Sequence, residues 1–192
     1  MNKIKSICIF CGTNSGVGLE YTKKTKQLAS AMINRNINLV FGGGSSGLMR
    51  VVADEFALKK KEIIGVIPQR YITSGAEHPG MTQVVVASDM DDRMSQMIQL
   101  ADAFIVLPGG LGTYSELFNV LYLIRMGIIK KPCAVYNIAD FFDGILRFME
   151  QSVNVEFLEV LHKEILISCD HPDFILDYME NYTPPVIPVL WK

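Results

Sequence analysis

One segment decides the fold class: Ala103-Phe104-Ile105-Val106-Leu107-Pro108-Gly109-Gly110-Leu111-Gly112-Thr113. Its apolar run, Ala103–Leu107, is short and rich in β-branched and aromatic residues, which predicts a buried strand. The glycine-rich turn after it leads into Thr113–Gly127, whose apolar pattern predicts a helix. The segment therefore predicts a strand, a turn and a helix in succession, which is the repeating unit of an α/β protein.

The same alternation extends outward in both directions. Six further apolar runs predict strands: Ile4–Phe10, Ile37–Phe41, Ile63–Ile67, Gln83–Val86, Cys133–Tyr136 and Glu164–Ser168. Helical patterns lie at Glu20–Arg35, Gly47–Lys60, Asp91–Ala101, Asp140–Ser152, Glu156–His162 and Pro172–Asn181. Near-continuous Val/Ile runs separated by helices indicate a parallel sheet covered on both faces. The predicted fold is an α/β, Rossmann-like doubly wound parallel sheet with three α/β/α layers.

The length and composition fit one soluble domain. The chain has 192 residues, of which 49% are hydrophobic and 20% charged, and no apolar run approaches the ~20 residues of a membrane span. We expect a single nucleotide-binding domain over residues 1–182 and a Pro-rich tail over 183–192, with Trp191 docked on the protein. The net charge of −2 lacks the basic excess of nucleic-acid binders, so we expect no nucleic-acid and no membrane partner.

The cysteines point to a reducing compartment. Cys8, Cys11, Cys133 and Cys169 fall in or beside apolar runs, which is typical of packed thiols in a cytoplasmic protein. Cys8 and Cys11 form a C-x-x-C pair, but on a strand they point to opposite faces, and no second pair has zinc spacing. We therefore expect no metal site and no redox site.

Three glycine-rich turns follow predicted strands. They are Cys11–Gly16, Gly42–Gly47 and Pro108–Thr113. The carboxyl ends of parallel strands share one edge of a sheet, so we expect the turns to converge on one crevice. Each also opens a helix, whose N-terminal N–H groups and dipole attract anions. A long irregular segment, Gln69–Thr82, is expected to lie over this crevice as a lid. Because no turn ends in the Lys-Ser/Thr of a Walker A loop, ATP hydrolysis loses support.

Two charged residues stand next to the predicted crevice. Glu116 lies in the first turn of the helix after Pro108–Thr113, and Arg93 lies near the start of another helix. Either could be purely structural: Glu116 as a favourable charge at a helix N-terminus, Arg93 as a surface ion pair with Asp89. Spacing alone leaves the functional and structural interpretations open.

Two motifs identify a family resemblance. Pro108 to Glu116 matches the PGGxGTxxE signature of the LOG family, and Gly42 to Met49 resembles its GGGxxGLM segment. Cys8–Gly12, Gly65–Pro68 and the M-x-x-R of Met90 to Arg93 agree as well, so the resemblance covers nearly the whole chain. The chain differs from the common pattern at Arg50, Arg70, Met94, Ser115 and Glu156, which leaves the choice of base open.

The resemblance implies a function. Family members are Rossmann-like and commonly homodimeric, and many are phosphoribohydrolases that act on cytokinin riboside 5′-monophosphates without a cofactor; they are often mislabelled lysine decarboxylases. Carried over, Arg93 and Glu116 correspond to the catalytic pair. The substrate-binding positions correspond to Gly43, Gly44, Gly109, Gly110, Gly112 and Thr113. The implied reaction is hydrolysis of the N-glycosidic bond of AMP or a cytokinin riboside monophosphate.

Two alternative functions belong to other classes of protein. One is a nucleotide-binding or cofactor-binding carrier or sensor without turnover, because related Rossmann-like proteins use similar glycine loops. The other is lysine decarboxylation, which needs a Lys to form a Schiff base with pyridoxal phosphate. No Lys falls in a glycine turn, so decarboxylation is disfavoured.

The helix at Thr113–Gly127 also predicts an interface. Its apolar residues occupy every side rather than one stripe, so the face opposite the sheet needs a partner. The simplest partner is the same helix of a second subunit, and we expect Leu121→Arg to give a monomer. The alternative is that Asp140–Ser152 or the C-terminal tail covers this face within one chain.

Overall fold

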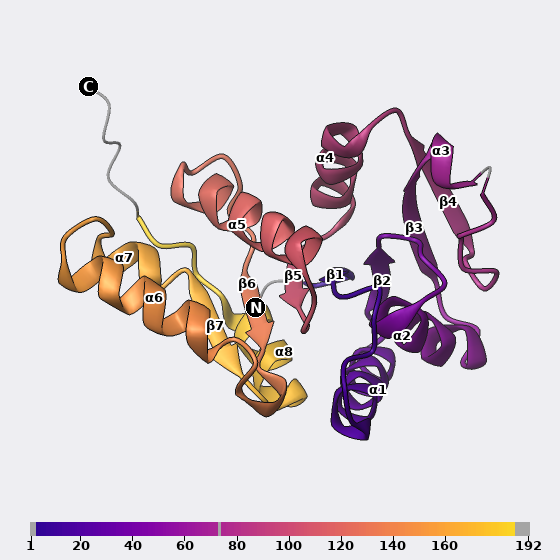
Figure 1. Ribbon diagram of the computed structural model, residues 1–192, viewed down its shortest axis with the longest axis horizontal. Coiled ribbons are helices and arrows are strands. Elements are labelled where there is room, and N and C mark those ends of the chain that lie inside the picture. The colour runs from indigo at the N-terminus through magenta and orange to yellow at the C-terminus, as the bar shows by residue number, and fades with distance from the viewer. Residues whose placement is uncertain (1–2, 73, 187–192) are drawn as a thin grey trace.

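The computed structural model describes residues 3–72 and 74–186, and a parallel β-sheet runs through it (Figure 1). Its strands are β1 (Ser6–Phe10), β2 (Asn38–Phe41), β3 (Ile63–Pro68), β4 (Gln83–Ala87), β5 (Ala103–Val106), β6 (Cys133–Tyr136) and β7 (Leu166–Cys169). Their order across the sheet is β4-β3-β2-β1-β5-β6-β7, and every neighbouring pair is parallel. The predicted strands and fold class are confirmed.

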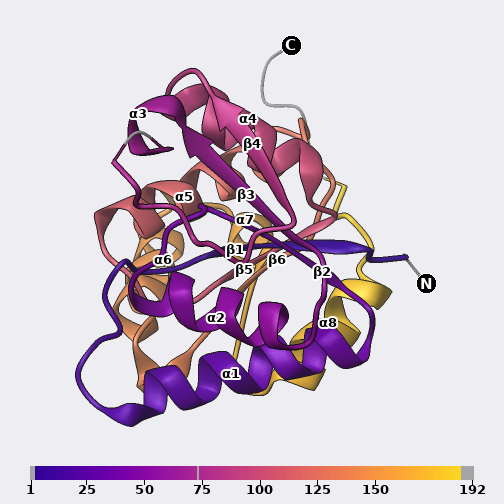
Figure 2. The ribbon, with the colours of Figure 1, turned by 90° about the vertical axis from the view of Figure 1, so that its right-hand side faces the viewer.

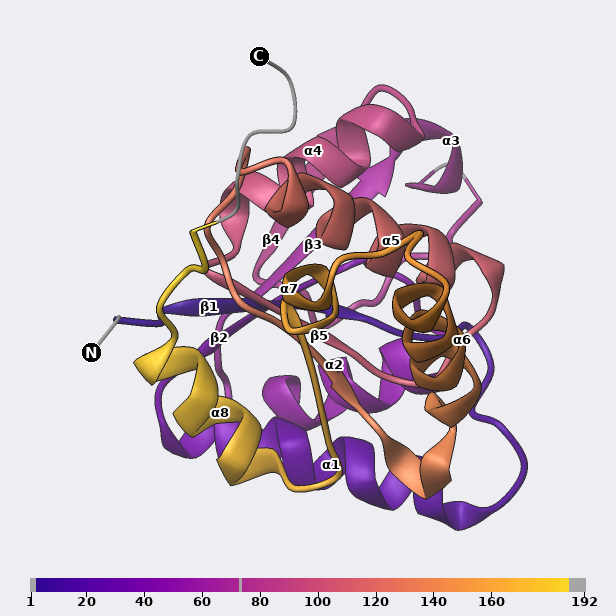
Figure 3. The same cartoon turned by 90° about the vertical axis from the view of Figure 1, so that its left-hand side faces the viewer.

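Helices cover both faces of the sheet. They are α1 (Leu19–Asn34), α2 (Gly47–Leu58), α3 (Gln69–Ile72), α4 (Met90–Leu100), α5 (Leu111–Arg125), α6 (Asp143–Asn154), α7 (Val160–Lys163) and α8 (Pro172–Asn181), with a 3₁₀ turn η1 (Ile138–Asp140). Figures 2 and 3 show α1, α2 and α8 below the sheet and α4 and α5 above it. Alternate strand residues therefore enter two separate cores. As predicted, Cys8 and Cys11 divide between them.

Four local details differ from the sequence prediction. The residues after Pro68 form the short helix α3 rather than continuing as an irregular loop. α5 begins at Leu111, two residues early, because Gly110 adopts an extended N-cap conformation. α6 begins only at Asp143, because Ala139 and Asp140 have positive φ and break the helical path. Glu156 also has positive φ, and α7 starts after it, at Val160.

Strand order positions the site. Going from β1, the chain adds β2, β3 and β4 on one side and then crosses to β5 on the other, so the order reverses between β1 and β5. Ligands of open α/β sheets bind outside the carboxyl ends of the strands at such a switch point. The glycine-rich turns after β1, β2 and β5 all lie at this edge.

Among the described residues no helix is both long and apolar enough to cross a bilayer. The predicted docking of Trp191 falls in 187–192, outside the described residues.

Candidate functional site

A cavity of about 640 Å³ opens at the switch point. The turns after β1, β2 and β5 line it together with the ends of β3 and the faces of α4 and α5. Its wall includes Cys11, Gly12, Gly42, Gly43, Gly44, Met49, Ile67, Tyr71, Glu77, Arg93, Gly110, Gly112, Thr113, Glu116 and Asn119. The predicted convergence of the glycine turns is thus observed.

The turn after β5 forms one end of the cavity. Gly110 is the N-cap of α5, so the N–H groups of Leu111, Gly112 and Thr113 belong to the first helical turn, where no intrahelical acceptor exists. A Cβ added at Gly110 or Gly112 would meet no atom within 4 Å. Packing within the chain therefore leaves room beside both glycines, and the helix dipole makes this space favourable for an anion.

Gly109 has a different place from its neighbours in the turn. A Cβ there would lie 2.1 Å from Thr113 Oγ1 and 2.9 Å from the Gly12 nitrogen. Gly109 is thus covered by Thr113 and does not line the cavity. Its glycine allows the buried Thr113 side chain to pack against the turn.

In the turn after β2, neighbouring side chains approach the backbone so closely that three positions leave little or no room for a Cβ. Gly43 has φ of +76°, a conformation that favours glycine, and its Cβ would fall 2.2 Å from the Ile67 side chain. Gly44 would contact Met49 at 2.9 Å. At Gly42 an added Cβ would lie 2.0 Å from Nη2 of Arg93, so this glycine makes room for the guanidinium.

Arg93 and Glu116 meet inside the cavity. Arg93 Nη1 donates to Glu116 Oε1 at 2.9 Å, and Arg93 Nε donates to the Val66 carbonyl at 3.0 Å. The side chains are only 11% and 17% exposed. A surface pair between Arg93 and Asp89 is not formed; the Asp89 carboxylate instead accepts from the Asp92 N–H at 2.8 Å. The predicted surface ion pair of Arg93 with Asp89 is therefore wrong, and the charged partner of Arg93 is Glu116.

The environment of Glu116 has opposing electrostatic effects. Burial raises the pKa of the Glu116 carboxyl, and the Arg93 guanidinium opposes that shift by its charge and its hydrogen bond. Cys11 also lines the cavity, but burial raises the pKa of its thiol far above the ordinary value. Cys11 is therefore a neutral thiol and a poor nucleophile.

The spacing along α5 and the residue types in the cavity wall limit which reactions the site can support. Thr113 and Glu116 lie three residues apart on α5, about 4.5 Å along its axis, so an anion bound by the N–H groups of the first turn lies on the N-terminal side of the carboxylate. The described part of the chain contains no cluster of three or more potential metal ligands. No lysine of the described residues lines the cavity, so pyridoxal phosphate has no partner for a Schiff base.

The predicted lid segment contacts the turn after β2. The Ser45 N–H donates to the Ala76 carbonyl at 3.0 Å, and the His78 N–H donates to the Gly43 carbonyl at 2.8 Å. Glu77 forms an antiparallel bridge with Gly44. The sequence placed the segment correctly but did not single out Glu77, because one acidic residue in a polar loop has no distinguishing pattern.

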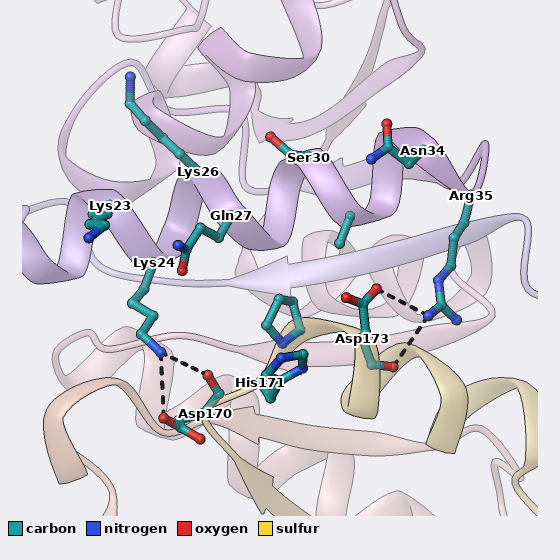
Figure 4. Close-up of a pocket in the computed structure, with 12 residues that line it drawn as sticks. Lys23, Lys24, Lys26, Gln27, Ser30, Asn34, Arg35, Asp170, His171 and Asp173 are labelled. Atoms are coloured by element: carbon teal, nitrogen blue, oxygen red, sulfur yellow. Dashed lines mark hydrogen bonds and ion pairs between the residues drawn. The ribbon is translucent and has the colours of Figure 1, made fainter.

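A second, larger groove of about 760 Å³ lies between α1 and the start of α8 (Figure 4). Lys24 pairs with Asp170 at 3.4 Å. Arg35 pairs with Asp173 and Asp177 at 3.2 and 2.7 Å. Its charges are therefore largely matched within the chain, and these pairs connect α1 to the C-terminal region.

Comparisons with known proteins identify the family of the chain. Residues 49–179 match the family model described as "Possible lysine decarboxylase". The chain is 34% identical over 183 residues to the Arabidopsis thaliana cytokinin riboside 5′-monophosphate phosphoribohydrolase LOG2, covering 95% of this chain and 86% of that protein. A probable enzyme of the same name from Oryza sativa subsp. japonica, LOGL3, is also 34% identical, with coverage of 95% and 87%.

A solved structure shares the fold at low sequence identity. The molybdenum cofactor carrier protein of Chlamydomonas reinhardtii superposes with a TM-score of 0.68 at 13% identity, covering 91% of this chain and 95% of that one. At this identity the likeness concerns the fold alone. The family model and the curated relatives are more specific, and they show that the chain belongs to the LOG family.

Proposed function

We propose that the protein hydrolyses the N-glycosidic bond of a nucleoside 5′-monophosphate, AMP or a cytokinin riboside monophosphate, to the free base and ribose 5-phosphate. The observation that carries this proposal is the Arg93-paired carboxylate of Glu116, one helical turn from an open set of helix N-terminal amides. The names of the curated relatives support the same reaction.

The 5′-phosphate binds at the start of α5. The N–H groups of the first turn and the Thr113 hydroxyl donate to its oxygens, and Gly110 and Gly112 leave the space that it occupies. Gly109 supports this turn from beneath, while Gly43 and Gly44 form the facing wall. Phosphate binding supplies energy remote from the bond that breaks and fixes the ribose beside Glu116.

Glu116 acts on the ribose during bond cleavage. As the bond from C1′ to the base nitrogen breaks, its electron pair leaves with the base and C1′ becomes oxocarbenium-like. The Glu116 carboxylate stabilises this cation or activates the attacking water. The water oxygen bonds to C1′, and the base is released carrying a proton. Arg93 orients Glu116 and the substrate rather than donating a proton, because a guanidinium is a permanent cation.

The first experiment distinguishes enzyme from carrier. Purified protein is incubated with AMP, and adenine and ribose 5-phosphate are measured by chromatography, with Glu116→Gln as the matched control. The proposal is supported if the wild type releases both products in equal amounts and Glu116→Gln does not. Tight AMP binding without release of either product would indicate the carrier or sensor instead.

The mode of phosphate binding predicts a strong preference for nucleotides. We expect kcat/KM for AMP to exceed that for adenosine by about 10³-fold or more, because adenosine loses several charge-assisted hydrogen bonds at the α5 turn. Steady-state kinetics with both substrates checks this. Comparable values would place the phosphate, or the reaction, elsewhere.

The proposed reaction consumes water and needs no cofactor.

We also propose that the protein works in the cytoplasm. This is supported by its four cysteines, all of which are free, because thiols stay reduced there.

We propose further that the protein is a homodimer through α5. Phe118 and Tyr122 on this helix remain 44% and 58% exposed, and Phe148 of α6 is 62% exposed beside them. They surround an apolar hollow of about 290 Å³. α6 thus covers part of the face, as the alternative expected, but a large apolar area is left. Leu121 is only 6% exposed and packs in the core, so Leu121→Arg is the wrong test, since it would damage the fold itself.

The interface is tested at the exposed positions. We expect Phe118→Arg to convert a dimer into a monomer, because a charge on a buried apolar interface is costly. Light scattering at micromolar concentration measures the mass. Phe174→Arg on α8 is the matched control, since Phe174 is 54% exposed on the opposite layer. A monomeric wild type would contradict the proposal.

A further inference from the structure

Glu77 occupies a special place in the cavity wall. It lies in the segment between α3 and β4 and lines the same cavity as Arg93 and Glu116. An antiparallel bridge between Glu77 and Gly44 fixes the position of Glu77 relative to the turn after β2. Two flanking backbone hydrogen bonds, from Ser45 to Ala76 and from His78 to Gly43, hold the residue from both sides.

The neighbouring His78 anchors this backbone. Its side chain is 3% exposed; Nε2 lies 3.0 Å from Asp54 Oδ1, and Nδ1 accepts from the Gly80 N–H at 3.1 Å. Both ring nitrogens are therefore occupied. Glu77 is held on a fixed part of the cavity wall, tied to α2 and to the turn after β2.

One carboxylate oxygen of Glu77 has no partner. Oε2 is buried and finds no hydrogen-bond donor among the described residues. Buried carboxylate oxygens are costly unless a donor reaches them, so an unpaired oxygen on a residue that lines a ligand cavity calls for a donor from the ligand. Arg93 in the same cavity wall does not fill this role, because its side-chain hydrogen bonds go to Glu116 and Val66 and none reaches Glu77 Oε2.

The position of Glu77 decides which part of the substrate it faces. The bridge places it at the end of β2, whereas the proposed phosphate site lies at the end of β5, two strand spacings or roughly 9 to 10 Å away across the sheet. A carboxylate also repels a phosphate. Glu77 therefore faces the nucleoside half, which offers ribose hydroxyls and, in adenine, an exocyclic amino group.

We infer that Glu77 is a specificity-determining residue that accepts a hydrogen bond from an O–H or N–H group of the nucleoside half of the substrate. This inference rests on the proposed function and deepens it. A site built around such an acceptor rejects an analogue that lacks the donor, because the buried oxygen is then left unpaired again.

The test combines variants with substrate analogues. Glu77→Ala and Glu77→Gln are assayed on AMP, 2′-deoxy-AMP, 3′-deoxy-AMP and purine riboside 5′-monophosphate, which lacks the amino group. We expect the wild type to lose about 10- to 100-fold in kcat/KM on the analogue that lacks the recognised donor. Glu77→Ala should lose a similar factor on AMP and little more on that analogue, with Glu77→Gln in between. The analogue that shows this coupling identifies the recognised group. A deoxy analogue indicates a ribose hydroxyl, and purine riboside 5′-monophosphate indicates the amino group of the base.

Controls separate this inference from the proposed function. Ser74→Ala, an exposed position in the same segment, should keep wild-type selectivity. If the wild type hydrolyses AMP but Glu77→Ala reduces all four substrates equally, the inference is overturned. If the wild type hydrolyses none of them, the proposed function fails, and calorimetric binding of AMP and the three analogues to wild type and Glu77→Ala still tests the inference by the same coupling.

Discussion

Glu116→Gln lowers kcat for AMP by about 10²- to 10⁴-fold and leaves AMP affinity within about tenfold. The substitution keeps the size of the side chain and a hydrogen-bond acceptor for Arg93 Nη1, but it removes the negative charge beside C1′. A neutral amide neither stabilises an oxocarbenium-like centre nor activates water. Single-turnover kinetics and calorimetric binding of AMP measure the two quantities separately.

The matched control for this prediction is Glu159→Gln, the same change at an exposed position on the protein surface. It should leave both quantities unchanged. Turnover by Glu116→Gln at the wild-type rate would remove Glu116 from the mechanism, whereas a large loss of AMP affinity would make it a binding residue.

Arg93→Met produces the second large effect, on stability as well as activity. It removes the counter-charge from a carboxylate that is 17% exposed, so we expect a loss of about 1–3 kcal/mol in the free energy of unfolding. Fully buried pairs lose more on such truncation, but this pair lines an open cavity that admits water. We also expect kcat/KM for AMP to fall by about 10²- to 10³-fold, because Glu116 loses its orienting partner.

A double variant isolates the pair. Arg93→Met combined with Glu116→Met should regain most of the stability while remaining inactive, because replacing both charges removes the uncompensated carboxylate. Denaturant unfolding of the wild type, both single variants and the double variant gives the coupling energy. A double variant no more stable than Arg93→Met would show that the ion pair does not govern stability here.

The pH dependence follows from the raised pKa of Glu116. With Arg93 removed, burial acts unopposed, so the pKa of the folded variant lies further above the ordinary value of 4.5. Protonation then favours the folded state relative to the unfolded one. The stability deficit of Arg93→Met should therefore be present at neutral pH and shrink as the pH falls through the raised pKa. A deficit independent of pH would assign the loss to packing instead.

Local patterns were enough to predict the elements of the fold. The strand at Ala103–Leu107 and its parallel neighbours were readable because fully buried strands are continuous apolar runs. Element ends were less accurate, as at α5, where Gly110 and Gly112 look like a loop in sequence. In the structure they belong to an N-cap and a first turn, whose N–H groups need no intrahelical acceptor.

The candidate site shows what the sequence by itself determined. Because carboxyl ends of parallel strands always share an edge, the glycine turns of a predicted parallel sheet had to bring Gly43, Gly110 and Thr113 to one edge. The sequence also placed Arg93 and Glu116 next to this crevice, and the resemblance added their expected catalytic roles. Spacing could not say whether they touch, since they come from α4 and α5, 23 residues apart.

Only the tertiary structure decided the relations between distant side chains. It joined Arg93 to Glu116, showed that Leu121 belongs to the core while Phe118 does not, and left a buried oxygen of the cavity-lining Glu77 without a partner. Each of these depends on how separate elements pack, and a helix or strand pattern fixes only which face is apolar, not which neighbour meets it. The chain's periodicity thus determined the fold and the edge that carries the site, while long-range packing determined the contacts from which its chemistry is argued.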